Sequence, residues 1–537
     1  AFCVAGASGC MEKPAAPSLM LETRAEQTAY EETSRYADVR AFIDALARDT
    51  PKVRVEMFGR SEEGRDLPLL VIGDPPVPAP PPRSSRPPVV FVMANIHAGE
   101  VEGKEATLRL ARRLTLGDLQ PLLPSAIWLF APIYNADGNE RISYDNRVQQ
   151  NGPIGGVGTR ENARGLDLNR DFMKLESSEA RALVALLAKW DPDVVVDLHT
   201  TNGSYHGYHL TYAPPLNPNT DGDIAAYARE RLLPAVQEAM STRHGFRTYE
   251  YGTFATADAM SQEIVAFAVG ETRRKVWQTF DARPRFGTNY SGLRNRIAIL
   301  SEAYSYLDFE RRIEATEAFL EEIVRFVAGN GDEIGSLTAA ADSRWTRGDA
   351  AREQGIASAI ELLPEPASIL VGSIRAKVNP RSGRTMWAMD EAIAVPVSMT
   401  VYDAFEATAT RRVPAEYIVL ASADGLADVV ERKLREHGIV VERTGAAVHR
   451  SVEQFTIANV VRDARQFQGH NTVALDGAPQ TVEIDVPAGS LLVRTNQPLG
   501  RLAFYLLEPE SDDGLTTWNF FDEALKSGVH PVLKSIP

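Results

Sequence analysis

Between residues 89 and 327 the sequence alternates short, continuous apolar runs with amphipathic helical patterns. The runs have the length of strands and carry no regular polar positions, so both of their faces are expected to be buried. Such strands, separated by helices, form a largely parallel sheet that helices cover on both sides. The pattern therefore predicts an α/β domain. The apolar runs are residues 89–93, 126–130, 194–198 and 297–301.

The chain has 537 residues, which is too long for one ordinary hydrophobic core. After Gly331 the sequence becomes polar and rich in alanine, and beyond Glu361 it changes to short alternating segments typical of β-strands. A smaller β-rich domain is therefore expected to follow the α/β domain. The predicted parts are an export-signal remnant and tether over residues 1–30, the α/β domain over 31–331, a linker over 332–360 and the β-rich accessory domain over 361–537.

Composition excludes several classes of protein. The formal net charge of −15 and the pI near 5.3 argue against a nucleic-acid partner, because a phosphate backbone is bound by clustered lysine and arginine. No apolar stretch approaches the roughly 18 to 20 residues of a membrane-spanning helix. The two cysteines, Cys3 and Cys10, lie near the start of the chain, so neither a disulfide within the folded body nor a cysteine-based zinc site is expected.

Residues 1–10 read as the end of an apolar export signal that runs into small residues. The segment resembles a bacterial lipoprotein signal ending at a lipid-acceptor cysteine, Cys10, although Ala7 stands where a larger aliphatic residue is commoner. We therefore expect an exported protein that is periplasmic or held to the membrane only through a lipid anchor at Cys10. The alternative is a frayed N-terminus with two incidental cysteines.

Three side chains with metal-ligand chemistry follow the apolar runs. His97 and Glu100 lie three residues apart where the first run passes into a helix, so an imidazole and a carboxylate converge on one side of the backbone. His199 lies at the carboxyl end of the third run, where open α/β sheets bind ligands. Two nitrogens and one carboxylate leave one tetrahedral position open for water, as in a catalytic Zn²⁺ site. Asp197 is expected either to orient an imidazole or to cap its strand.

Glu302 follows the fourth apolar run, again at the carboxyl end of a predicted strand. A zinc hydrolase needs a base that takes a proton from the metal-activated water and passes it to the leaving group. An uncompensated carboxylate beside so much apolar sequence is costly to bury, which favours a functional role for Glu302. The alternative is a structural acid that pairs with one of the nearby arginines, which are Arg296, Arg311 and Arg312.

An ordered set of motifs runs through the α/β region. The set consists of Ser61-Glu62-Glu63-Gly64-Arg65, His97 with Glu100, Asn135-Ala136-Asp137-Gly138, Asp167-Leu168-Asn169-Arg170, His199 and Glu302. It resembles that of the zinc metallocarboxypeptidases, the carboxypeptidase A-like superfamily, over roughly residues 36–323. The resemblance implies a mixed, mostly parallel sheet of about eight strands flanked by helices. The setting Ser301-Glu302-Ala303-Tyr304 replaces the more familiar Glu-Leu-Arg, which indicates a divergent bacterial branch.

The resemblance also assigns roles on the substrate side. Asn169 and Arg170 match the pair that binds the terminal carboxylate of the substrate, and a two-pronged guanidinium suits a carboxylate. The expected partner is therefore a peptide with a free C-terminal carboxylate. An arginine upstream of Asn169 is expected to stabilise the oxyanion, and Arg160 is favoured over Arg147 and Arg164.

Tyr290 is the nearest match to the family's mobile tyrosine that covers the substrate, although it lies closer to Glu302 than is usual. The alternative is a packed core tyrosine. His206 and His209 are close enough in sequence to His199 to line the pocket or to support the structure, and neither is expected to be a ligand. The histidines of the accessory domain lack ligand spacing and are expected to be structural or exposed; they are His437, His449, His470 and His530.

Together these residues predict a zinc-dependent hydrolase that removes C-terminal residues from peptides, with Glu302 as the general base. A deacylase or amidase of the same superfamily, acting on N-acyl amino acids or cell-wall peptides, is the alternative among enzymes, because it shares the metal triad and the Asn-Arg pair. An inactive peptide-binding protein is the second alternative, against which retention of the ligands and of Glu302 weighs. The accessory domain is expected to scaffold the site or to gate access to it.

Overall fold

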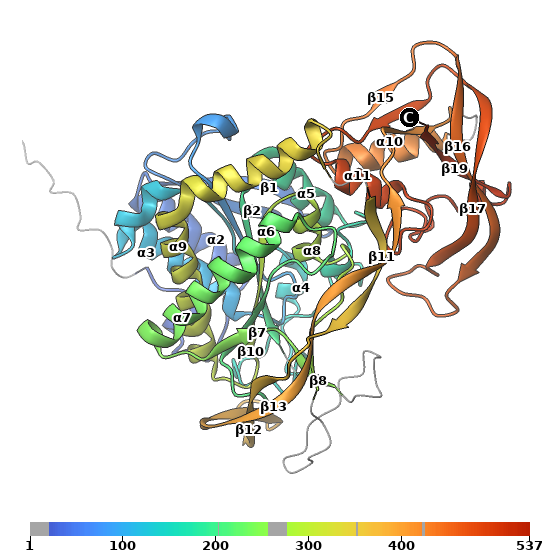
Figure 1. The fold of residues 1–537 in the computed structure, drawn as a ribbon. Helices are drawn as coiled ribbons and strands as arrows, with labels where there is room; N and C mark the ends of the chain where they lie inside the picture. The colour runs from blue at the N-terminus through green and yellow to red at the C-terminus, as the bar shows by residue number, and fades with distance from the viewer. Residues whose placement is uncertain (1–20, 202, 256–275, 351–352, 422–424, 537) are drawn as a thin grey trace, which may run out of the picture.

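The computed structural model describes residues 21–201, 203–255, 276–350, 353–421 and 425–536 (Figure 1). The predicted lipid-acceptor cysteine, Cys10, lies outside these residues. An eight-stranded sheet forms the centre of the N-terminal part, with the strand order β1-β2-β4-β3-β5-β10-β6-β7. Its strands are β1 (Val53–Arg60), β2 (Asp66–Ile72), β3 (Val89–Ala94), β4 (Ile127–Ala131), β5 (Val194–Thr201), β6 (Leu210–Ala213), β7 (Thr248–Glu250) and β10 (Ile297–Tyr304).

The sheet is mixed, which confirms the predicted fold class. The strands β4, β3, β5 and β10 run parallel in its middle. On one side β1 and β2 form an antiparallel hairpin, and β2 is antiparallel to β4; on the other side β6 is antiparallel to β10. Every residue of β3, β4 and β5 is buried, as expected of parallel strands covered on both faces.

Helices flank this sheet (Figure 1). The helix α3 (Glu102–Leu116) packs against α9 (Phe309–Thr346), which packs in turn against α7 (Leu233–His244). Two further helices, α2 (Tyr36–Asp49) and α5 (Ser178–Trp190), lie against β1. Within the described ranges, no helix is both long enough and apolar enough to span a membrane.

The helix α9 is longer than the sequence suggests. The sequence predicts a domain end near Gly331 and a linker over residues 332–360, whereas α9 continues to Thr346 and β11 (Glu353–Leu362) begins soon afterwards. Inside α9 only Asn330 departs from helical torsion angles. The alanine-rich residues beyond it are good helix formers, and some of them are buried. Packing therefore holds this segment in a helix, although its composition resembles that of a linker.

The C-terminal part is rich in strands, as predicted. The strands β11 and β13 (Thr385–Arg412) join β9 (Val276–Gln278) and β8 (Thr253–Ala255) in one sheet, and β12 (Ala367–Val378) pairs with β13. A separate six-stranded sheet lies at the upper right of Figure 1. It contains β14 (Glu416–Val419), β15 (Glu442–Arg443), β16 (Val448–Arg462), β17 (Val473–Val486), β18 (Leu491–Arg494) and β19 (Val529–Ser535), with α10 (Leu426–Glu436) and α11 (Gly500–Leu507) beside it.

The hairpin of β12 and β13 reaches back onto the first part of the chain. The backbone N–H of Met389 in β13 donates to the carbonyl of Tyr306, 2.7 Å away, just beyond β10. His206 and Val371 in β12 form an isolated antiparallel bridge. The C-terminal part is therefore bonded to the segments that follow the central strands β5 and β10.

Candidate metal centre and active site

Three predicted metal ligands gather at the carboxyl end of the central strands. The strand β3 ends at Ala94, and the chain turns through Asn95, which has a left-handed φ of 65°, before it reaches His97. Glu100 lies in the next turn, where its N–H donates to the carbonyl of His97 at 2.9 Å. His199 projects from β5. The ligand atoms of His97, Glu100 and His199 all lie within 4.8 Å of one another.

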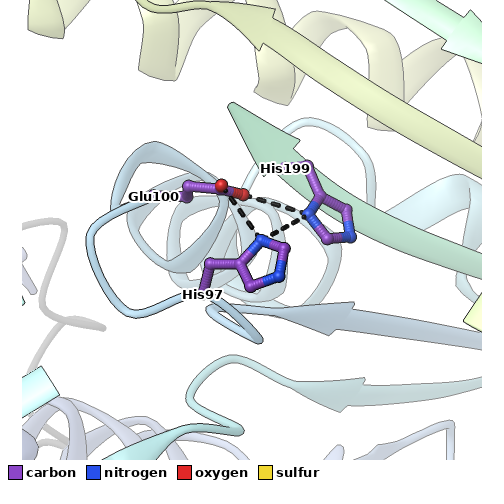
Figure 2. A group of neighbouring side chains, drawn as sticks. All are labelled: His97, Glu100 and His199. Atoms are coloured by element: carbon purple, nitrogen blue, oxygen red, sulfur yellow. Dashed lines mark hydrogen bonds and ion pairs between the residues drawn. The ribbon is translucent and has the colours of Figure 1, made fainter. Parts of the chain in front are cut away.

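Both imidazoles turn the same ring nitrogen towards the carboxylate of Glu100 (Figure 2). His97 Nδ1 lies 3.0 Å from Glu100 Oε1, and His199 Nδ1 lies 3.0 Å from Glu100 Oε2. The two Nδ1 atoms are 3.3 Å apart. Two ring nitrogens and a carboxylate that converge in this way are the donor set of a catalytic zinc site with one open position. The residues present therefore fit Zn²⁺.

The electrostatics of this buried group also favour a cation. Burial opposes the ionised form of Glu100, but His97, Arg147 and His199 together hold its pKa well below the usual value. Burial likewise opposes protonation of His199, yet Asp197 and Glu100 raise its pKa well above the usual value. Carboxylates that attract a proton onto an imidazole attract a divalent cation to the same place.

Each imidazole has a carboxylate behind it. His97 Nε2 lies 3.0 Å from Asp167 Oδ1, and His199 Nε2 lies 3.0 Å from Asp197 Oδ2. Such partners fix the orientation of a metal-binding ring and raise its basicity. For Asp197 this agrees with one of the two roles expected from the sequence. The role of Asp167 was missed, although the residue begins the quoted Asp-Leu-Asn-Arg motif, because nothing in the spacing indicates which histidine it meets.

Glu302 lies directly beside His199, because β10 and β5 are parallel and these two residues are partners in the register. Burial and the nearby Glu100 raise the pKa of Glu302 to about 8, although His199 and two arginines act in the opposite direction. Among the described residues, no hydrogen bond or ion pair of its carboxylate is found. The alternative of a structural acid is wrong, because the three arginines pair elsewhere. Arg296 pairs with Asp191 and Asp342, Arg311 with Glu314, and Arg312 with Glu102.

Two of the three arginines considered for the oxyanion reach the site. Arg147 donates to Glu100 Oε1 at 2.7 Å, and its other nitrogens donate to neighbouring oxygens, so it is fully engaged. Arg160 donates to Asp167 through Nε, while its Nη1 lies 3.8 Å from Glu100 and its side chain is 40% exposed. Arg164 lies outside the site, where its guanidinium donates to the carbonyl of Glu176. Arg160 therefore keeps a donor that a substrate can reach.

The Asn-Arg pair lies next to this group on a single 3₁₀ turn, Leu168–Arg170. The Asn169 side-chain oxygen accepts from the N–H of Gly287 at 2.9 Å. The Arg170 guanidinium lies 3.9 Å from the centre of the Phe286 ring, and its side chain is 20% exposed. The turn therefore brings a guanidinium with an accessible edge beside the candidate metal site.

The prediction that Tyr290 covers the substrate is wrong, and the alternative of a packed core tyrosine is correct. Tyr290 lies in α8 (Gly287–Leu293) and is fully buried, with its hydroxyl 2.8 Å from His437 Nδ1. Tyr251, between β7 and β8, lies closer to the chemistry. Burial and the neighbouring Glu302 raise the pKa of Tyr251, whose hydroxyl bonds Thr201. The sequence carries no signal for Tyr251, because only the folded chain brings it to Glu302.

The other histidines considered from the sequence serve the structure or lie at the surface. His206 packs against the ring of Tyr304, with ring centres 4.2 Å apart, and His209 Nε2 lies 3.1 Å from Glu391. Neither belongs to the metal group, as expected. In the C-terminal part, the positions of the histidines agree with the prediction: His437 and His530 are buried, His470 is half-buried and His449 is exposed.

The fold and the site together define a zinc-dependent hydrolase. Residues 39–297, which contain the three predicted ligands, match the model of a family described as zinc carboxypeptidase. The family assignment therefore applies to this domain, which is that of a metallocarboxypeptidase.

Among the relatives, a fungal carboxypeptidase extends the similarity beyond this domain. Carboxypeptidase 2 of Trichophyton rubrum is 24% identical over 508 residues, which cover 90% of this chain and 84% of the relative. Carboxypeptidase Z of Mus musculus is 33% identical over 156 residues, which cover 27% of this chain and 22% of that protein. A solved metallo-carboxypeptidase from Burkholderia cenocepacia aligns at 19% identity with a TM-score of 0.39, covering 56% of this chain and 70% of that one. The fungal alignment thus also takes in much of the C-terminal part.

Proposed function

We propose that this metallocarboxypeptidase removes single residues from peptides with a free C-terminal carboxylate, and that His97, Glu100 and His199 hold its zinc. The observation that carries the proposal is the carboxylate of Glu302, which lies in register with His199 and is free of any partner among the described residues. A half-buried carboxylate that no side chain neutralises is costly to keep for structure alone. It is suited to act as a base.

Zinc, when bound, polarises water and the scissile carbonyl group. Glu302 then accepts a proton from the attacking water and delivers it to the nitrogen of the leaving amine. Its raised pKa, about 8 before any metal charge is added, places it in a range where it can both take and give a proton. The free donor of Arg160 is available to hold the oxyanion of the tetrahedral intermediate.

The substrate's terminal carboxylate is assigned to Asn169 and Arg170. Because the Asn169 oxygen is taken by the N–H of Gly287, its amide nitrogen stays available as a donor. The Arg170 guanidinium lies against the Phe286 ring, and a guanidinium can bind a carboxylate through two parallel hydrogen bonds. A positive charge beside the reaction centre thus selects the end of a peptide chain.

Peptides with free C-termini and their amidated twins test this proposal. The free peptides should be cleaved and the amidated ones should not. Arg170→Met should raise KM for the free peptides about 10- to 100-fold, because a charged hydrogen-bonding partner is lost. Arg164→Met, on the outer side of the site, is the matched control and should leave KM unchanged. Equal cleavage of both peptide sets would contradict the assignment of the carboxylate subsite.

A deacylase or amidase acting on N-acyl amino acids or cell-wall peptides is the second candidate, since it would use the same ligands and the same Asn-Arg pair. Elemental analysis together with the peptide panel separates the two. Zinc bound without peptide cleavage would favour the deacylase. An inactive peptide-binding protein has no use for a free Glu302, and its ligand binding would survive chelation.

The cellular location is proposed from the sequence alone. Residues 1–10 support an exported protein, periplasmic or anchored through lipid on Cys10, of a divergent bacterial branch. Mass spectrometry of the N-terminal peptide from the full-length protein in its native cells tests this. Acylated Cys10, and release from membranes on Cys10→Ser, are the expected results. An unmodified Cys10 in a soluble fraction would contradict the anchor.

A further inference from the structure

A tight turn of the six-stranded sheet reaches the active site. Beyond the paired residues of β16 and β17, Phe467 and His470 bond to each other in both directions through their backbones. Between them Gln468 and Gly469 have φ values of 52° and 84°. Positive φ at both central residues is the signature of a type I′ turn, whose twist matches that of a hairpin. The tip therefore has a fixed shape and presents Gln468 at its apex.

Gln468 bonds to Asp167, an acid that contacts several residues of the site. Its side-chain oxygen accepts a hydrogen bond from the backbone N–H of Asp167 at 2.9 Å. The Asp167 carboxylate in turn holds His97 Nε2 at 3.0 Å and Arg160 Nη2 at 2.8 Å. One side chain from the C-terminal sheet thus supports the residue that orients a metal ligand and the candidate oxyanion donor.

Further contacts place the turn on the side of the substrate carboxylate. The Arg285 guanidinium lies 5.2 Å from the centre of the Phe467 ring and is paired with Asp513 at 2.8 Å. The residue after Arg285 is Phe286, whose ring supports Arg170. The turn is therefore joined to the 3₁₀ turn that carries Asn169 and Arg170 both through Asp167 and through the segment 285–286.

The turn is also clamped to the catalytic domain from its far side. His470 Nε2 lies 2.9 Å from Glu176, and His470 Nδ1 lies 2.9 Å from the side-chain oxygen of Asn519. With one contact at the apex and one behind it, the turn cannot pivot away from Asp167 without breaking an ion pair.

We propose that Gln468 is a positioning residue that completes the active site from the C-terminal domain. By accepting the Asp167 N–H, it holds the segment 167–170 so that Asn169 and Arg170 face the terminal carboxylate of the substrate. The part concerning the substrate rests on the function proposed above. Removal of Gln468 should therefore weaken substrate binding more than the chemical step. Glu302 and His199 are held by the pairing of β10 with β5, and the Asp167 carboxylate keeps its own contacts with His97 and Arg160.

Three variants of the full-length zinc-loaded enzyme test the proposal. Gln468→Met removes the acceptor at nearly constant length, and Gln468→Glu keeps an acceptor oxygen. Gln466→Met is the matched control, one residue before the turn, since the Gln466 side chain makes only a 3.5 Å contact with Asn471. The first readout is amide hydrogen exchange of the peptide that covers residues 160–172. The second is kcat and KM on a peptide with a free C-terminus.

The expected result is about fivefold faster exchange in Gln468→Met than in the wild type, and about a fivefold higher KM with kcat nearly unchanged, as fits the loss of one hydrogen bond. Gln468→Glu should keep the slow exchange, and Gln466→Met should match the wild type in both readouts. Equal exchange and equal KM in Gln468→Met and Gln466→Met would overturn the proposal. Wild-type enzyme that leaves all free peptides uncut would instead overturn the proposed function, and the exchange comparison would still decide whether Gln468 holds the segment.

Discussion

At the scale of single residues, the decisive contrast is between carboxylates that have partners and one that has none. Asp167 and Asp197 each face an imidazole, and Glu100 faces two. Glu302 lies beside them, and its carboxylate has no partner in the described part of the chain. Ionisable groups in unusual electrostatic surroundings cluster at functional sites, which favours a catalytic role for Glu302.

Replacing Glu302 with glutamine should separate catalysis from metal binding. The amide keeps the size of the side chain and cannot accept a proton, so kcat should fall by about 10²- to 10⁴-fold. Zinc content should stay at the wild-type level because the ligands are untouched. Stopped assays on a free-carboxylate peptide and elemental analysis provide the two measurements. Activity within a few-fold of the wild type would remove Glu302 from its role.

Much of this residue pattern could be predicted from the sequence. Parallel strands end at one edge of a sheet, so residues that follow separate apolar runs must meet there, as His97, His199 and Glu302 do. What could not be predicted is which carboxylate lies behind the imidazole of each metal-binding histidine. That depends on the path of the loop before Asp167, and sequence spacing does not encode that path.

At the scale of elements, the helix α8 shows where spacing misleads. Tyr290 has a suitable residue type and stands upstream of Glu302, but α8 packs on Phe172 with the Tyr290 ring inward, at a centre distance of 5.5 Å. Tyr251 reaches the site from the short connection between β7 and β8. Which tyrosine is near the chemistry is set by strand order, because β7 and β10 both flank β6.

Two phenylalanine substitutions should distinguish these tyrosines. Tyr290→Phe leaves the buried His437 and Arg294 without the hydroxyl, so it should cost about 1–3 kcal/mol of stability while kcat/KM stays near the wild-type value. Tyr251→Phe should lower kcat/KM about 10-fold with a smaller loss of stability, because its hydroxyl interacts electrostatically with Glu302. Thermal unfolding and steady-state kinetics on both variants give the comparison. A large loss of kcat/KM in Tyr290→Phe would contradict the assignment of Tyr290 to the core.

At the scale of the whole molecule, the C-terminal part is bonded to the catalytic domain at many points. Period-two alternation predicted its strands, but it does not tell which strand a residue will pair with across the chain. The pairing of β13 with β9 and the bond from Gln468 to Asp167 are contacts of this kind. The contact between the two parts also contains a titratable pair, His470 with Glu176.

The ion pair of His470 and Glu176 should make this contact weaken as pH rises. Glu176, the neighbour that contributes most, together with Asn519 raises the pKa of His470 above its usual 6.5, against burial and Lys174. Burial opposes ionisation of Glu176, but His470 and Lys174 lower its pKa to about 2, so Glu176 stays charged at neutral pH. The stabilisation is thus fully present below about pH 6.5 and is lost as pH rises through the folded pKa of His470.

The loss of melting temperature caused by His470→Gln should therefore be larger at about pH 5.5 than at about pH 8.5. His449→Gln is the matched control. Its pKa is also raised, chiefly by Asp485, but its side chain is 64% exposed and solvent screens the pair, so its effect should be small at both values. An equal loss of melting temperature at the two pH values in His470→Gln would contradict this prediction. His470 would then hold the turn through hydrogen bonds of its neutral imidazole, because only a charged imidazole makes the stabilisation depend on pH.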